Sequence, residues 1–148
     1  MKPDVGKLLE IVSGKLLFEI APAVQPSYRQ SSVQITAMLL GMVREEWERS
    51  AARRVEENAL LRGLFARAAT RVSDTDLCRR LETAAAGADP DLRISALDAS
   101  NGTLRALLID LHAHVETQDA PWARALEDEI WRELVASTER RRFALSPF

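Results

Sequence analysis

Two histidines and two carboxylates lie within the seven-residue stretch DLHAHVE, from Asp110 to Glu116, and the chain contains no further histidine. Imidazole and carboxylate groups together can bind a metal ion or transfer a proton. Apolar residues recur around them at positions 104, 108, 111 and 115, which predicts a helix packed against a core. At about 100° per residue, His112 and His114 fall roughly 80° to either side of this apolar stripe. One metal ion therefore cannot easily bind both rings.

Each histidine has its own carboxylate at a spacing of four, His112 with Glu116 and His114 with Asp110, which predicts two local pairs. A di-iron bundle would need a Glu-x-x-His motif on each of two helices, and the chain lacks it. We interpret the histidines as rim residues of helix packing and expect no catalytic residue and no cofactor. The alternative is a metal or small-molecule site in a groove near His112. There Glu116 would orient the ring, and the helix that begins near Ser31 would add a carboxylate.

Two tryptophans mark candidate interaction surfaces. Trp47 lies within a charged run, REEWERSAARRVEENALLR, and Trp131 lies off the apolar stripe of the last helix. Tryptophan is enriched at the centres of protein interfaces, so both residues are predicted to contact a partner. The alternatives are a solvated charged face around Trp47 and a last helix that is buried on more than one side.

Composition limits the classes of protein that fit. With 148 residues, of which 47% are hydrophobic, the chain can form a single helical domain over residues 1–148 with its own core. A formal net charge of -2 lacks the positive field of a nucleic-acid-binding protein. No apolar run is long enough to cross a membrane. The single cysteine, Cys78, and the lack of an apolar leader predict a reduced, cytoplasmic protein.

Apolar residues recur with helical spacing along the chain, and no segment alternates with a period of two. The predicted fold class is all-α, an antiparallel helical bundle of four to five main helices. The first helix is expected to begin at Asp4 and end at Pro22, and a capping box, Ser31 with Gln34, to open the second. Ser73 with Asp76 is expected to cap a shorter helix. Asn101-Gly102 is expected to form a turn, and Pro121 to start the last helix.

Residues 31–71 contain no proline, and the sequence leaves open whether they form one helix or two. A single helix of about 40 residues would be some 60 Å long, roughly twice the diameter expected for a compact domain of this size. The comparison favours a break, bend or projection between residues 48 and 54.

The N-terminal part carries a pattern of its own in Pro3-Asp4, the run Leu8-Leu9-Glu10, Pro22, and a helix that ends in Arg44-Glu45-Glu46. This part resembles a family of small bacterial all-helical domains of unknown function. Those domains accompany aminoglycoside-phosphotransferase-like kinases and acyl-CoA dehydrogenases. The resemblance implies an accessory role, with a kinase or dehydrogenase as partner, and assigns no catalytic residue. The function predicted is a non-catalytic interaction module that self-associates, as a dimer, or binds a cytoplasmic enzyme.

Overall fold

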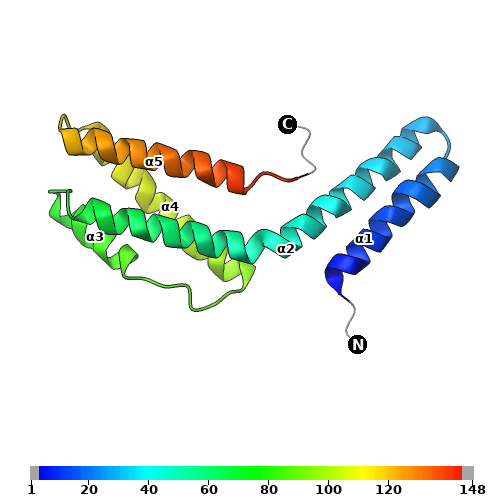
Figure 1. The fold of residues 1–148 in the computed structure, drawn as a ribbon, viewed down its shortest axis with the longest axis horizontal. Coiled ribbons are helices and arrows are strands. Elements are labelled where there is room, and N and C mark those ends of the chain that lie inside the picture. The colour runs from blue at the N-terminus through cyan, green and yellow to red at the C-terminus, as the bar shows by residue number, and fades with distance from the viewer. Residues whose placement is uncertain (1–3, 145–148) are drawn as a thin grey trace. The chain divides into compact units, whose positions relative to one another are not determined.

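The computed structural model describes residues 4–144, and every regular element in that range is helical, which confirms the all-α fold. In chain order (Figure 1) the elements are α1 (Val5–Lys15), the π-helical turn η1 (Leu16–Ile20), the 3-10 turn η2 (Ala21–Ala23), α2 (Ser27–Ala69), α3 (Thr75–Ala85), α4 (Ile94–Glu116) and α5 (Pro121–Arg140). None of these helices combines the length and the apolar character required to span a bilayer.

The described residues group into two compact units, whose boundary falls inside α2. The first unit runs to Ser50 and includes residues 143 and 144, and the second is Ala51–Arg142. Helix α2 continues without interruption through this boundary, so of the break, bend or projection expected between residues 48 and 54, the break is wrong. No proline or glycine lies between Gly41 and Gly63 to interrupt the helix. The expected length limit applies to one compact body, whereas α2 extends through two compact units. A single domain over residues 1–148 stays a prediction.

The first unit is a helical hairpin made of α1 and the N-terminal half of α2. Asp4 caps α1, as predicted, because its Oδ1 accepts a hydrogen bond of 3.1 Å from the backbone N–H of Lys7. Helix α2 begins at Ser27, four residues before the predicted start. The Ser31 hydroxyl donates to the carbonyl of Ser27 and therefore lies inside the helix instead of capping it.

The second unit contains the hydrophobic core, to which α2, α3, α4 and α5 all contribute. Its most deeply buried large side chains are Leu61, Leu64, Phe65, Leu81, Leu111, Leu126 and Ile130. Asp74 caps α3 by accepting from the N–H of Leu77 at 2.8 Å, one residue after the predicted cap. The turn predicted at Asn101-Gly102 is wrong, because both residues lie inside α4. Helix α5 begins at Pro121, as predicted.

Candidate functional site

Helices α4 and α5 place four chemically distinctive side chains side by side in the second unit. His112 and Glu116 lie one turn apart on α4, while Glu127 and Trp131 lie one turn apart on α5. Four residues toward the C-terminus of α4, from His112 to Glu116, correspond to four residues toward the N-terminus of α5, from Trp131 to Glu127. This relation is expected for neighbouring antiparallel helices. His112 consequently contacts Trp131, and Glu116 lies near Glu127. We call these four residues the His112 cluster.

The His112 ring packs edge-to-face against Trp131. The two ring centroids are 5.5 Å apart and the planes are almost perpendicular, at 87°, an arrangement that aromatic pairs favour. The Nε2 atom of His112 is buried and has no hydrogen-bond partner. It lies 3.6 Å from Oε1 of Glu116, too far for a normal hydrogen bond. One ligand atom from each of His112, Glu116 and Glu127 lies within 4.8 Å of the other two.

The other two residues named from the DLHAHVE stretch lie apart from this cluster. Asp110 forms an ion pair with Arg80 of α3 instead of the predicted pair with His114. The Nε2 atom of His114 is buried and has no hydrogen-bond partner. The separation of the two histidines expected from helix geometry is therefore consistent with their different neighbours.

Sequence reasoning missed Glu127 and expected the third carboxylate from the second helix. The sequence pattern could have predicted that Glu127 lies near Glu116. Glu127 precedes Trp131 by one helical turn, and the short loop after α4 makes α5 the antiparallel neighbour of α4. Trp131 is 53% exposed although its ring contacts His112, and Trp47 of the first unit is 61% exposed. A partner contact at either tryptophan stays a prediction.

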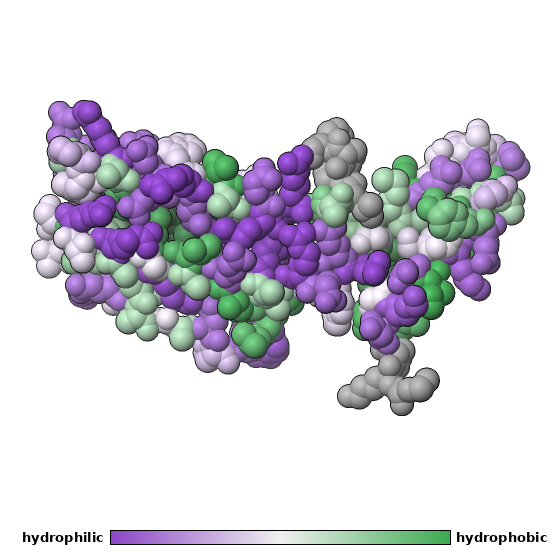
Figure 2. Space-filling model, in the orientation of Figure 1, coloured by the Kyte–Doolittle hydropathy of each residue, from purple (hydrophilic) through white to green (hydrophobic). Residues whose placement is uncertain are grey.

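Exposed hydrophobic residues lie among hydrophilic ones on the helical hairpin (Figure 2). On α2, Ala37 is buried, and its carbonyl accepts a hydrogen bond of 2.8 Å from Ser13 of α1. This contact identifies the side of α2 that faces α1. On the opposite side, at roughly 100–240° from Ala37 by helix geometry, lies an apolar stripe that is more than half exposed. We call it the outer stripe, and it consists of Ile35, Met38, Leu39 and Val43.

The second unit contains two networks of buried polar side chains that join its helices and connecting segments. The first network is centred on Glu57 of α2. Glu57, 2% exposed, accepts hydrogen bonds from Arg105, Ser137 and Arg141, the last at 2.7 Å. Burial alone would raise the pKa of Glu57. The bonds and charges of these partners outweigh burial, and the pKa lies below its ordinary value. The carboxylate thus ties α2 to α4 and α5, and each of its oxygens has a partner.

The second network fixes the segment between α3 and α4. Arg62 binds Asp89 through two hydrogen bonds of 2.8 Å, and Ser100 and Asn58 donate to the same carboxylate. The Arg62 bonds, above all, hold the pKa of Asp89 far below its ordinary value. Asp89 thus anchors the irregular segment between α3 and α4 to α2.

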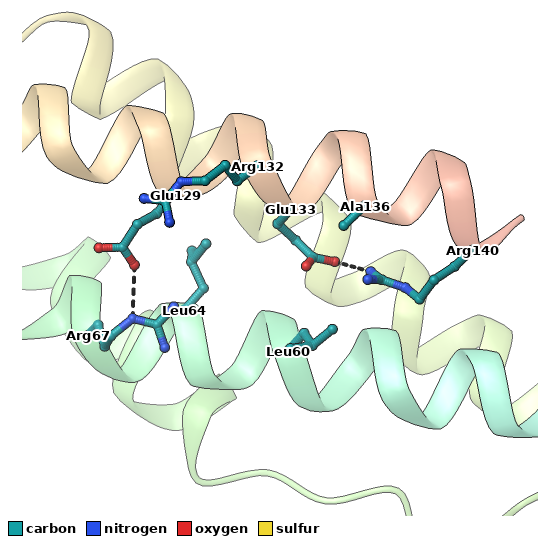
Figure 3. A pocket seen from close by; sticks show the side chains of 8 residues that line it. All are labelled: Leu60, Leu64, Arg67, Glu129, Arg132, Glu133, Ala136 and Arg140. Carbon is teal, nitrogen blue, oxygen red and sulfur yellow. Dashed lines mark hydrogen bonds and ion pairs between the residues drawn. The ribbon is translucent and has the colours of Figure 1, made fainter.

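A groove between α2 and α5 has Leu60 and Leu64 on its α2 side and encloses about 340 Å³ (Figure 3). Its carboxylates are already bound by arginines. Glu129 accepts from Nε of Arg67 at 2.9 Å, and Glu133 pairs with Arg140. Burial raises the pKa of Glu133, against the effect of Arg140. The Arg67–Glu129 pair joins α2 to α5, whereas Glu133 and Arg140 both belong to α5. Because arginine keeps its proton, neither ion pair provides a proton-transfer pair.

No protein-family model, curated protein or solved structure matches the chain. The relation of the N-terminal part to the accessory helical domains stays a prediction. The outer stripe and the His112 cluster are the features of residues 4–144 on which a function can be proposed.

Proposed function

We propose that the protein is a non-catalytic interaction module, and that two copies associate through the outer stripe of α2. The observation that carries the proposal is the placement of Ile35, Leu39 and Val43 on the side of α2 opposite the α1 contact. A stripe with this spacing is typical of a helix that packs against another helix. Within residues 4–144 the hairpin has no further helix on this side of α2.

The exposed apolar area of the outer stripe supports a contact. Its four side chains are each 52–57% exposed and at roughly 100 Å² each present about 400 Å² of apolar surface. The largest apolar patch of a typical soluble monomer has about this size and is often a binding surface. Further exposed large hydrophobic side chains of the hairpin are Val5, Leu8, Ile11, Val12, Phe18, Ile20, Tyr28 and Trp47, and those of α1 that point away from α2 are not part of this stripe.

The residues at the two ends of the stripe favour a second copy, in antiparallel orientation. Continued along the helix, the line of the stripe reaches Tyr28 and Ser32 at one end and Glu46 and Arg49 at the other. An antiparallel pair centred between Met38 and Leu39 places Arg49 near the partner's Tyr28, a favourable cation–π pairing. It also places Glu46 near serine hydroxyls. A parallel pair would align like charges, Glu46 with Glu46 and Arg49 with Arg49.

The test is the oligomeric state of the full chain, measured by sedimentation velocity between about 1 and 100 µM. We expect a dimer for the wild type. Leu39→Glu places two carboxylates, one from each copy, near the two-fold axis. We therefore expect this variant to lower the affinity of the dimer at least 100-fold, which corresponds to about 2.7 kcal/mol of binding free energy. Ile109→Glu is the matched control, since Ile109 is a 68% exposed apolar residue of α4 in the second unit, and this variant should remain dimeric.

A monomeric wild type at 100 µM, or a Leu39→Glu variant that dimerises as well as the wild type, would overturn the proposal. In the monomeric case a cytoplasmic enzyme, a kinase or dehydrogenase, becomes the candidate occupant of the stripe. Its stoichiometric co-purification with the wild type but not with Leu39→Glu would establish that role.

A further inference from the structure

We propose that His112, Glu116 and Glu127 form a binding site for one divalent first-row transition-metal ion, with Zn²⁺ as the representative cation. This site is independent of the proposed self-association, because all three residues belong to α4 and α5 of the second unit.

The donor set comprises one imidazole nitrogen and two carboxylates. Imidazole is a good ligand for Zn²⁺ and related transition metals, whereas Mg²⁺ and Ca²⁺ prefer sites made of oxygen alone. Two carboxylates supply two negative charges, which balance a divalent cation when the imidazole is neutral. The composition of the site therefore favours transition metals over the alkaline-earth ions.

The geometry requires only small side-chain movements. In a tetrahedral site with metal–ligand distances of about 2.0–2.2 Å, neighbouring ligand atoms are roughly 3.4 Å apart. The candidate ligand atoms already lie within 4.8 Å of one another. His112 and Glu116 are 3.6 Å apart, close to the required spacing. Side-chain rotation of Glu116, which is exposed, and of Glu127 closes the remaining distance without moving either helix.

The state of His112 supports a role as ligand. Its Nε2 atom is buried and lacks a hydrogen-bond partner, which is costly for a polar atom unless a ligand completes its bonding. Trp131 packs edge-to-face against the ring and restricts its rotation, so Nε2 is held on the side of the two carboxylates. A ligand with a fixed orientation loses little conformational entropy when it binds a metal.

Three protein ligands leave at least one coordination position open for water or a small anion. Glu116 is exposed, so solvent can reach the site. The site is thus of the open kind and differs from a closed structural zinc site with four protein ligands.

The test is Zn²⁺ binding to the full chain without a histidine tag, by equilibrium dialysis with metal analysis and by calorimetric titration. We expect one equivalent bound with a dissociation constant in the micromolar range or below. Binding should weaken at least 10-fold in Glu127→Gln and Glu116→Gln, which preserve side-chain shape, and in His112→Ala. Millimolar Mg²⁺ should not displace the ion. With Co²⁺, visible absorption bands of four- or five-coordinate intensity should appear in the wild type and vanish in Glu127→Gln.

The matched control is His114→Ala, which removes a buried histidine two residues away and should leave binding unchanged. The proposal is overturned by less than about 0.2 equivalent of Zn²⁺ bound at 100 µM, or by equal losses in His114→Ala and His112→Ala. Binding that survives Glu127→Gln but disappears in Cys78→Ser would assign the ion to the thiol and would also overturn it. Circular dichroism of each variant shows whether a loss of binding reflects a loss of fold.

Discussion

Replacing Asp89 by asparagine should destabilise the second unit strongly, although the substitution hardly changes side-chain shape. The Asp89 side chain is 8% exposed and accepts two hydrogen bonds of 2.8 Å from Arg62, whose side chain is 13% exposed. Ser100 and Asn58 donate two further bonds, of 2.7 and 3.1 Å. An asparagine there removes the negative charge and turns one acceptor into a donor. The Arg62 guanidinium is then left buried without its counter-ion.

The magnitude follows from the burial of this ion pair. Removing one partner of a buried pair costs about 3–5 kcal/mol. Because Arg62 keeps a small contact with water, we expect a value near the lower end, about 3 kcal/mol. With a urea m-value of about 2 kcal/mol/M, the unfolding midpoint should fall by roughly 1.5 M. Arg62→Met together with Asp89→Asn removes both charges, so the double variant should be more stable than the sum of the single effects by about 2 kcal/mol.

The assay is equilibrium urea unfolding followed by tryptophan fluorescence. Substituting Trp47→Phe in every protein leaves Trp122 and Trp131, both in the second unit, as the fluorescence reporters. If Asp89→Asn costs less than about 1 kcal/mol, or if its effect adds simply to that of Arg62→Met, the ion pair does not hold the segment between α3 and α4. The reasoning would then be refuted.

Two further predictions concern pH and an exposed glycine. The pKa values of Asp89 and Glu57 are lowered in the folded protein. Below pH ~5 the unfolded chain therefore binds more protons than the folded protein, and the free energy of unfolding decreases as the pH is lowered. Urea midpoints between pH 7 and 3 should show this loss, with a shallower slope in Asp89→Asn; an equal slope would contradict the assignment to Asp89. Gly102 lies inside α4, and a Cβ there would meet nothing within 4 Å. Gly102→Ala should therefore stabilise the protein by about 0.5–1 kcal/mol, and a lower thermal midpoint would contradict the helical placement of this residue.

The candidate metal site shows how far sequence reasoning reached. Helix periodicity placed His112 and Glu116 one turn apart and separated them from His114, because these relations depend on a single helix. It did not identify Glu127, since the third ligand depends on the register between α4 and α5. The pairing of Asp110 with Arg80 was missed for the same reason, because an arginine of another helix lies within reach.

The sequence by itself determined the all-α character, the cap of α1 at Asp4 and the start of α5 at Pro121, because these features follow from local spacing and from chemistry within one turn. The turn expected at Asn101-Gly102 was overridden by packing. Asn101 is buried in α4, and its amide donates to the Asn58 side chain at 2.9 Å, a bond that no local pattern reveals. Helix α2 likewise runs from one compact unit into the other, and no local pattern in the sequence marks this division. Only the tertiary structure decides which apolar stripe becomes core and which stays exposed, because burial depends on the partners that surround a helix as well as on its own periodicity.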